Sequence, residues 1–306
     1  MTVVDLPLRS VSQLNQYTRC PQAYKLARID KVWPRPAAWL PQGTAFHTVA
    51  EHIEKSLAEG RLVGLEEAQE LFKEEYSKDI GALCEETPNF DWWFHSGPYN
   101  GERDIERRYH IGLEQVEKFM NWRSIKGQEI WWTPGITDPR CVVSDEANFT
   151  IPAAPEERII HRSECGCEPA KPAIELSFAI ILDTPIGPIK VRGFIDAVVV
   201  VGGEPRVRDY KTGSKPGDDF QLGVYGLAIK KLYGVDVNTG DYFMAGKKGK
   251  KPVVTVPYDI SEWTEEKVSD RFHEVEKGIQ SGEFEPLPEA DKCAFCDVSY
   301  FCPVYQ

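Results

Sequence analysis

The sequence predicts an α/β fold, with helices gathered in the N-terminal half and strands accompanied by helices in the C-terminal half. The first observation is a helical spacing of apolar residues in several segments between residues 10 and 126. The second is a series of apolar, β-branched runs between residues 173 and 256. The third is a group of cysteines within residues 293–302, whose spacing is typical of a metal-binding loop.

Composition sets the broad class of the protein. The 306 residues can bury a large core, and 42% hydrophobic with 27% charged residues is ordinary for a soluble globular protein. No apolar run has membrane-spanning length and the start lacks signal-peptide features, so we expect a cytoplasmic protein without a membrane partner. In such a reducing compartment eight cysteines favour metal ligands or free thiols over disulfides. A net charge of −12 predicts that any contact with nucleic acid is confined to a local basic groove.

The first predicted element is a short helix beginning at Ser10, because Ser10 and Gln13 have capping-box spacing. Cys20-Pro21 ends this helix and begins another over Gln22 to Ile29, since proline suits only the first turn of a helix. Cys20 is therefore expected at a helix N-terminus, where the dipole favours a thiolate and hence metal ligation. A buried structural cysteine is the plainer alternative.

Three longer helices follow in the prediction. The first runs from Gly43 to about Gly60, and His47 lies beside its apolar stripe. A histidine in that position is usually a hydrogen-bonded core residue, so its role as a metal ligand depends on other parts of the chain. Charged amphipathic helices are predicted over Leu65 to Leu83 and over Gly101 to Lys126.

Residues 84–171 are expected to be an insertion, because this segment fits no recognisable motif. The aromatic loop Asn89 to Phe94 could stack on single-stranded bases, although packing against the core is the commoner role of such rings. One residue separates Cys165 from Cys167, which is tighter than the usual spacing of zinc ligands. The cysteines of this segment are expected to be free thiols: Cys84, Cys141, Cys165 and Cys167.

The first clear strand is predicted over Ala173 to Leu182, and a β-hairpin follows, made of Pro188 to Val201 and Arg206 to Lys211. Gly202-Gly203 suits its tight turn, because glycine adopts positive φ without steric cost. Antiparallel counting from that turn places Asp196 opposite Asp209. The same register places Phe194 opposite Lys211.

This register suggests a chemistry. Since side chains alternate between the two faces of a sheet, Asp196, Asp209 and Lys211 are predicted on one face. Two adjacent carboxylates repel unless a cation joins them, and Mg²⁺ prefers oxygen ligands. A lysine beside the metal can stabilise charge on a pentavalent phosphate or orient the attacking water, as in metal-assisted phosphodiester hydrolysis. The alternative is a surface hairpin in which Asp209 and Lys211 form a solvated pair.

The remaining elements are a helix over Asp218 to Tyr233, a second hairpin around residues 246–251, and a final helix over Glu262 to Ser281. Gln221 and Tyr225 lie four residues apart on one face of the first of these helices. The lysine-rich tip of the second hairpin could contact phosphates or form a solvated turn.

The C-terminal cysteines indicate a metal site. Cys293 and Cys296 form a CxxC pair and Cys302 adds a third thiol, which is a strong signal for a soft metal. The missing fourth ligand points to Cys20, and such a site would join the two ends of the chain. Four thiolates suit either zinc or an iron–sulfur cluster.

Taken together, these motifs resemble the RecB-like branch of the PD-(D/E)XK nuclease superfamily. The similarity is closest to the four-cysteine, iron–sulfur type found as stand-alone CRISPR-associated exonucleases and in phages. The matching motifs, in order, are Cys20-Pro21, Gly43 to His47 (GxxxH), Gly193 to Asp196 (GxxD), Asp209 to Lys211 (DxK), Gln221 to Tyr225 (QxxxY) and the terminal cysteines.

The resemblance implies a restriction-endonuclease-like core, a mixed central sheet flanked by helices, in a single domain over residues 1–306. It implies that Mg²⁺ or Mn²⁺ is bound by His47, Asp196, Asp209 and the carbonyl of Tyr210. Lys211 would be the catalytic lysine. The other implied roles are substrate positioning by Gln221 and Tyr225, and a [4Fe–4S] cluster on Cys20, Cys293, Cys296 and Cys302. Glu175 would be structural or would support the ligands.

The function implied is that of a metal-dependent DNA nuclease, acting on single strands or ends and, as the first expectation, a 5′→3′ exonuclease. No G-x-x-x-x-G-K-[ST] loop is present in the sequence, so a helicase motor would be a separate partner chain. Two alternatives remain from the residues alone. One is a nuclease-like scaffold that binds DNA without cutting it, and the other is a zinc-stapled adaptor in recombination or replication.

Overall fold

The computed structural model describes residues 6–94, 98–135, 141–144, 149–152, 169–246 and 248–305, with the backbone alone for 141–144 and 149–152. Its helices are α1 Val11–Arg19, α2 Pro21–Tyr24, α3 Trp39–Ala58, α4 Leu65–Glu86, α5 Gly101–Lys126, α6 Asp219–Tyr233, α7 Glu265–Gln280 and α8 Ala290–Cys293, with a π-helix at Lys25–Ile29 and 3₁₀ turns at Phe90–Trp92 and Ser299–Phe301. None of the helices in these residues is both long and apolar enough to cross a membrane.

The centre of the molecule is a mixed sheet of eight strands in the order β1-β6-β7-β8-β10, with β2 and β5 also paired to β6 and β9 to β8. These strands are β1 Leu8–Arg9, β2 Glu129–Ile130, β5 Ile174–Leu182, β6 Ile189–Val201, β7 Glu204–Lys211, β8 Thr239–Met244, β9 Val253–Val254 and β10 Tyr258–Asp259, and a separate pair is formed by β3 Cys141–Ser144 and β4 Phe149–Pro152. β5, β6 and β7 are antiparallel neighbours, whereas β7 and β8 run parallel. The predicted α/β fold with a mixed sheet flanked by helices is confirmed.

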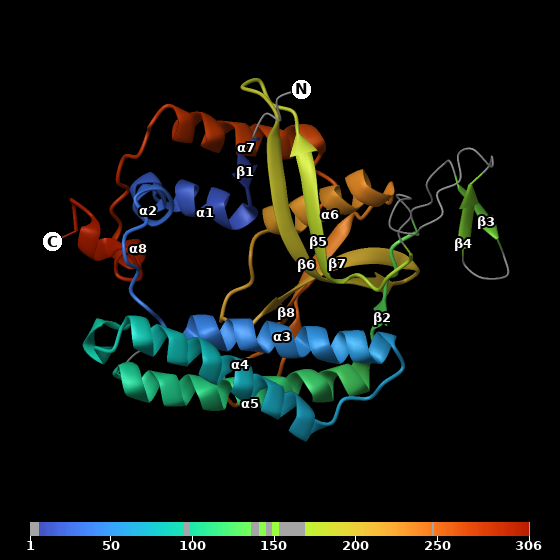
Figure 1. The fold of residues 1–306 in the computed structure, drawn as a ribbon, viewed down its shortest axis with the longest axis horizontal. Coiled ribbons are helices and arrows are strands. Elements are labelled where there is room, and N and C mark those ends of the chain that lie inside the picture. The colour runs from blue at the N-terminus through green and yellow to red at the C-terminus, as the bar shows by residue number, and fades with distance from the viewer. Residues whose placement is uncertain are drawn as a thin grey trace.

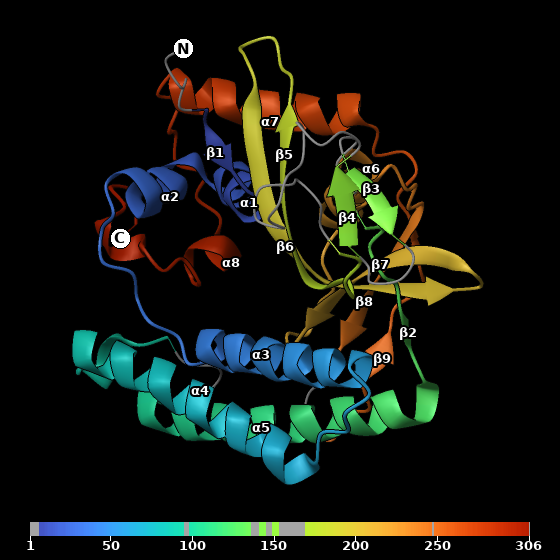
Figure 2. The same cartoon turned by 45° about the vertical axis from the view of Figure 1, so that its right-hand side comes forward.

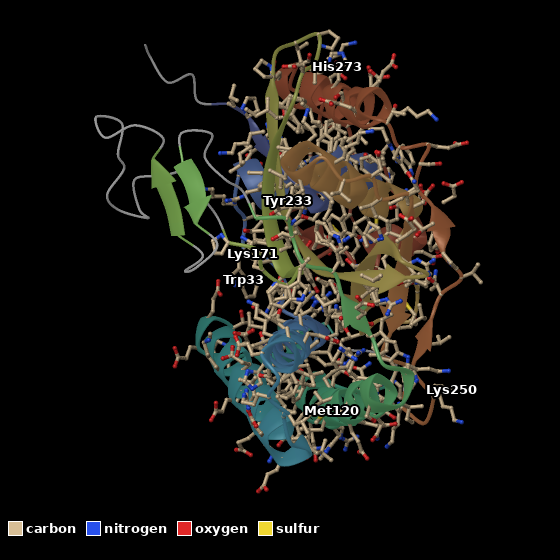
Figure 3. The ribbon with its side chains drawn as sticks, turned by 90° about the vertical axis from the view of Figure 1, so that its right-hand side faces the viewer. Trp33, Met120, Lys171, Tyr233, Lys250 and His273 are labelled. Atoms are coloured by element: carbon tan, nitrogen blue, oxygen red, sulfur yellow. The ribbon has the colours of Figure 1, made fainter. Side chains whose placement is uncertain are left out.

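Two hydrophobic clusters hold helices against this sheet. The first joins the sheet to α1, α6 and α7 through residues such as Leu14, Phe220 and Phe272. The second joins it to α3, α4 and α5 through residues such as Phe46 and Phe119. Figures 1 and 2 show the three helices of the second cluster running together along one end of the sheet. In Figure 3, Met120 marks the second cluster and Tyr233 borders the first.

The N-terminal helices form as the sequence predicts, with one exception. The Ser10 hydroxyl accepts a hydrogen bond from the Gln13 amide, and Cys20 is both the C-cap of α1 and the N-cap of α2. The prediction that a helix starts at Gly43 is wrong, because α3 already begins at Trp39. Gly43 lies inside this helix, where a Cβ would make an ordinary van der Waals contact with the Thr212 hydroxyl at 3.5 Å.

The central hairpin has the predicted turn and register. Gly202 and Gly203 have φ of 64° and 86°, and Val201 pairs with Glu204. The ladder ends at Ala197 and Arg208, so the predicted pairs of Asp196 with Asp209 and of Phe194 with Lys211 are wrong. Beyond that point the strands diverge, because β6 continues its pairing with β5 while β7 continues with β8. The two aspartates therefore stand at a fork between β6 and β7.

Within residues 84–171, the aromatic loop packs into the protein. Trp93 is fully buried, and its indole nitrogen donates to the Thr87 carbonyl. Trp92 meets the ring of Tyr300 edge to face, with centroids 4.6 Å apart. Core packing, the plainer of the two predicted roles, is therefore right for Trp93. The predicted free thiols Cys165 and Cys167, and the side chain of Cys141, lie outside the described residues, whereas Cys84 is a free cysteine on α4.

The C-terminal segment returns to the first helices, as Figures 1 and 2 show. Arg19 donates to the carbonyl of Lys292, and the Arg35 amide donates to the carbonyl of Asp297. The Tyr17 hydroxyl donates to the carbonyl of Glu283. Residues far apart in the sequence are thus brought together at α2 and α8.

Candidate active site and cysteine cavity

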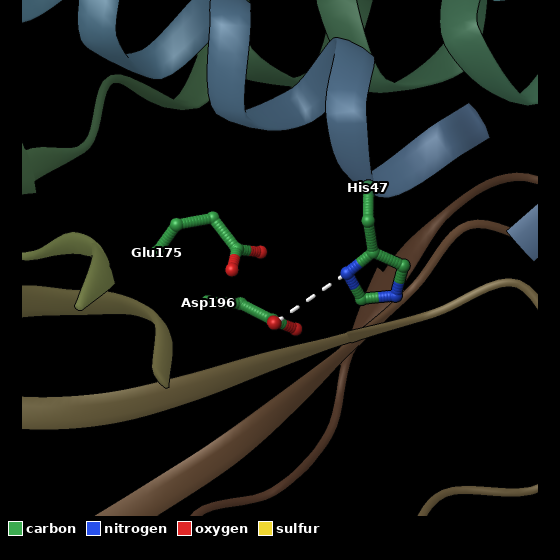
Figure 4. Close-up of side chains that lie close together, drawn as sticks. All are labelled: His47, Glu175 and Asp196. Atoms are coloured by element: carbon green, nitrogen blue, oxygen red, sulfur yellow. Dashed lines mark ion pairs between the residues drawn. The ribbon is translucent and has the colours of Figure 1, made fainter. Parts of the chain in front are cut away.

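Three side chains from three elements meet where β5 and β6 pass α3. His47 extends from α3, Glu175 from β5 and Asp196 from β6, as Figure 4 shows, and one ligand atom from each lies within 4.8 Å of the others. His47 Nδ1 is 3.4 Å from Asp196 Oδ1. One imidazole nitrogen and two carboxylates are a donor set for a divalent cation.

Glu175 reaches this group through an unusual backbone conformation. Its φ is +45°, one of two positive values among the non-glycine residues that the structure describes. In the β5–β6 register it lies between the pairs Ile174–Ala197 and Leu176–Ile195, and so at the level of Asp196. A non-glycine residue in this region costs on the order of 1–3 kcal/mol, which the surrounding sheet offsets. This backbone conformation brings the Glu175 carboxylate to His47 and Asp196.

The electrostatics of the group favour a bound cation. Burial raises the pKa of Glu175, and the charge of Asp196 raises it further, to about 7. Burial lowers the pKa of His47, but the charge and hydrogen bond of Asp196 outweigh this and bring it to about 8. Burial and Asp196 likewise raise the pKa of Asp209. Burial and the neighbouring charge therefore disfavour ionisation of Glu175 and Asp209, a cost that a metal ion would remove.

Asp209 occupies the other side of the fork. Its Oδ2 lies 2.7 Å from Lys211 Nζ, and its Oδ1 accepts a 2.7 Å hydrogen bond from Gln221 Nε2. The same Gln221 nitrogen donates to the Tyr225 hydroxyl at 2.7 Å. Of the five residues predicted from the DxK and QxxxY motifs, four thus form one connected set: Asp209, Lys211, Gln221 and Tyr225.

Tyr210 links the two carboxylate groups through its backbone. Its amide donates to Asp196 Oδ2 at 2.6 Å. Its ring is buried in the second cluster, and its hydroxyl contacts Gln128, which also accepts from Arg208. The ring lies beside that of His47, with centroids 6.4 Å apart, and its hydroxyl is engaged by Gln128, so the main chain is the part of Tyr210 left to serve as a ligand.

Glu175 is a candidate metal ligand that the sequence analysis did not assign. Glu175 was expected to be structural or to support the ligands, whereas the structure places its carboxylate with His47 and Asp196. A signal was present, because Glu175 is an acidic residue in an apolar strand. Asp209, by contrast, is not part of the three-residue group and contacts Lys211 and Gln221 instead.

The predicted cysteines meet at a second place, between α2 and α8. Together they line a single cavity of about 70 Å³: Cys20, Cys293, Cys296 and Cys302. The loop between the last three coils tightly, since the Cys296 amide donates to the Cys293 carbonyl and the Ser299 amide to the Cys296 carbonyl, both at 3.1 Å. Cys20 Sγ accepts from the Leu287 amide at 3.5 Å. The four thiols line one cavity, but among the described residues no three of them bring their sulfur atoms within 4.8 Å of one another, as a closed tetrahedral site for a single ion would require.

Comparison with known proteins adds three findings. A family model described as the PD-(D/E)XK nuclease superfamily matches residues 9–303. The chain is 68% identical over 303 residues to the Gene 69 protein of Mycobacterium phage L5, covering 98% of each chain. It is 58% identical over 307 residues to the Gene 69 protein of Mycobacterium phage D29, covering 100% of each. A solved structure, that of SSO0001, aligns with a TM-score of 0.31 at 15% identity over 44% of this chain and 61% of that one, a likeness too low to support an argument.

Proposed function

Because the chain belongs to the PD-(D/E)XK nuclease superfamily, we propose that it is a metal-dependent deoxyribonuclease that acts on single strands or DNA ends, in the 5′→3′ direction. The observation that carries the proposal is the fork between β6 and β7. There the group of His47, Glu175 and Asp196 is joined through the Tyr210 amide to the strand bearing Asp209 and Lys211.

In the proposed mechanism His47, Asp196, Asp209 and the Tyr210 carbonyl hold Mg²⁺ or Mn²⁺, with Glu175 close enough to take part. When bound, the ion polarises the phosphodiester and lowers the pKa of the attacking water. Lys211 remains paired with Asp209 and places its positive charge where negative charge develops on the phosphate. Gln221 fixes the orientation of Asp209 through its hydrogen bond.

Tyr225 is proposed to position the substrate. Burial, followed by the charges of Asp209 and Asp196, raises its pKa far above the usual range, so its hydroxyl keeps its proton at neutral pH. That hydroxyl accepts from Gln221 and can itself donate to a phosphate oxygen. Gln221 and Tyr225 thereby connect α6 to the reacting group.

We assign the cysteine cavity a [4Fe–4S] cluster that stabilises the fold. The donor set suits four-thiolate ligation, and the choice of iron and sulfide over zinc rests on the resemblance to four-cysteine nucleases. Bound there, the cluster connects α2 with residues 293–302. The same proposal treats residues 1–306 as one nuclease domain in which 84–171 are an insertion, and any helicase motor as a separate chain.

Cleavage of labelled DNA tests the proposal. The purified protein is incubated with single-stranded and duplex DNA labelled at either end, with Mg²⁺, with Mn²⁺ and with EDTA. We expect metal-dependent release of short products from the 5′ end of single strands, and no release in EDTA. Full activity in EDTA, or no cleavage with either metal by folded protein, would contradict the proposal.

A further inference from the structure

A pocket of about 450 Å³ lies at the carboxyl ends of the parallel strands β7 and β8. Its walls are the start of α3, one side of α5 and the loops that follow the two strands. We call it the Arg107 pocket and define it by these residues: Trp39, Arg107, Arg108, Gln115, 212–214 and Lys248. The carboxyl ends of parallel strands are a common place for ligands in α/β proteins.

One stripe of α5 faces the pocket. At about 100° per residue, its four lining residues fall within about 100° of one another around the helix axis: Arg107, Arg108, Ile111 and Gln115. The Gln115 amide nitrogen donates to the carbonyl of Thr212 at 3.1 Å and to that of Gly246 at 2.8 Å. The guanidinium carbon of Arg108 lies 5.6 Å from the centroid of the Trp39 ring. These contacts place the side chains of this stripe, and not only its backbone, at the pocket.

The Arg107 pocket carries a surplus of positive charge. Arg107 and Arg108 share the buried carboxylate of Asp104, whose Oδ1 lies 3.0 Å from Arg107 Nη1 and 3.6 Å from Arg108 Nε. That carboxylate offsets one of the two charges. The exposed Lys248 brings a third cation and forms no ion pair with the residues that the structure describes. No aspartate or glutamate is among the described lining residues, so the pocket favours an anion although the chain has a net charge of −12.

The two loops hold further hydrogen-bond donors in place. The amides of Gly213 and Ser214 donate no hydrogen bond to any described residue, and successive amides of this kind in a bend suit a phosphate group. The loop after β8 is tied to α5, because the Gly249 amide donates to Glu114 at 2.8 Å. Glu114 is also paired with Lys118 at 2.8 Å, so its charge already has a partner.

The Arg107 pocket adjoins the candidate active site. Thr212 directly follows Lys211 in the chain, and its hydroxyl lies beside Gly43, one turn before His47 on α3. Trp39 precedes His47 by eight residues, which is about 12 Å along the helix. A DNA strand whose cleaved phosphate lies at Lys211 therefore reaches the pocket within a few nucleotides.

We propose that the Arg107 pocket binds a phosphate group of the DNA strand that is being cleaved, a few nucleotides from the phosphate at Lys211. This inference rests on the proposed nuclease function. The planar guanidinium of Arg107 and the Lys248 ammonium contact the phosphate oxygens, and the amides of Gly213 and Ser214 add neutral donors. A 5′-terminal phosphate and an internal phosphodiester share this chemistry, and the experiment distinguishes them.

Binding is measured by fluorescence anisotropy in EDTA, where cleavage is blocked. Two single-stranded oligonucleotides of one sequence carry a label at the 3′ end and either a phosphate or a hydroxyl at the 5′ end. The double variant Arg107→Gln/Lys248→Gln should lower the slope of log K against log salt by about 0.7, the value for one phosphate, so that its loss of affinity is about fivefold larger at 0.1 M than at 1 M salt. A loss confined to the 5′-phosphorylated strand identifies the terminal phosphate, and an equal loss with both strands identifies an internal one.

The control is Lys126→Gln, which removes an exposed cation from the last turn of α5, about 28 Å along the helix from Arg107. It should leave affinity and salt slope unchanged. Melting temperatures show which variants are folded. If the double variant does not fold, Lys248→Gln carries the test, since it breaks no ion pair with the described residues and should lower the slope by part of the same amount.

If the folded variants bind both oligonucleotides as the wild type does at every salt concentration, or if Lys126→Gln is equally impaired, the assignment of the Arg107 pocket is wrong. DNA cleavage by the wild type would then still support the nuclease. If the pocket variants lose affinity while the wild type cuts no DNA with either metal, the pocket stands and the nuclease proposal fails.

Discussion

The fork between β6 and β7 and the cysteine cavity both join residues that are far apart in the sequence, but they are held in different ways. At the fork, strands buried by two hydrophobic clusters position the side chains, and Asp196 receives a backbone hydrogen bond at 2.6 Å. The cavity is surrounded by a four-residue helix, short turns and half-exposed cysteines. We infer that the sheet alone sets the geometry of the candidate active site, whereas the cavity would need a bound group to hold its shape.

The largest effect that this contrast predicts is on activity without loss of stability. Asp209→Asn should abolish metal-dependent cleavage, because it removes one proposed ligand and the partner of Lys211. Burial and Asp196 already disfavour the Asp209 charge, so a neutral amide should not lower the melting temperature of the metal-free protein. Cleavage assays and thermal unfolding in EDTA check both parts. If the variant cleaves DNA at the wild-type rate, Asp209 is not part of the active site.

Lys211→Ala should reduce the single-turnover rate by about 100- to 1,000-fold, the usual cost of losing one group that stabilises developing charge. DNA affinity should fall far less, because Lys211 is proposed to act on charge that develops in the transition state rather than on the bound substrate. The rate is measured with enzyme in excess, and the affinity by anisotropy. An unchanged rate would mean that Asp209 and Lys211 form only a structural ion pair.

The cysteine cavity should show the reverse pattern, with stability affected first. Protein purified without oxygen should be brown and contain iron and sulfide. Cys302→Ser should remove the colour, lower the melting temperature and reduce activity indirectly, because the contacts between α2 and residues 293–302 loosen. Cys84→Ser is the matched control, since Cys84 is a free cysteine on α4 outside the cavity. Stoichiometric zinc without iron in anaerobic protein would refute the cluster while leaving the four-cysteine site.

Local signals in the sequence were sufficient for much of this arrangement. The Ser10 cap, the Gly202-Gly203 turn and its register depend on neighbouring residues, and the structure confirms them. The start of α3 was misplaced because its N-cap, Ala38, makes no side-chain capping bond and so leaves no signal. The grouping of the four cysteines followed from residue type and spacing, and they do line one cavity.

Features that depend on contacts across the sheet could not be predicted in the same way. Asp196 and Asp209 do not pair, because beyond Ala197 and Arg208 β6 pairs with β5 and β7 pairs with β8. These pairings depend on strands that are distant in the sequence. The position of Glu175 depends on a positive φ that no residue preference predicts for glutamate. Short-range patterns therefore located the strands of the site, and tertiary pairing decided which side chains meet there.

The smallest predicted effect concerns Glu175 and tests whether its carboxylate belongs to the crowded group. Its pKa is raised to about 7 from a usual value of 4.5, so the folded state favours the protonated form. The resulting stability is fully present below about pH 4.5 and is lost as pH rises through about 7. His47, with a pKa raised to about 8, contributes in the same direction at slightly higher pH.

Metal-free protein should therefore lose stability between about pH 5 and 8, and Glu175→Gln should flatten this slope because the amide does not ionise. Exposed Glu285 provides the matched control variant, Glu285→Gln, which should keep the wild-type slope. Chemical denaturation at several pH values in EDTA measures the slope, and addition of Mg²⁺ should stabilise the wild type most at the high end, where the ligands are deprotonated. If Glu175→Gln and the wild type have the same slope, the Glu175 carboxylate is screened from Asp196 and does not share its cation.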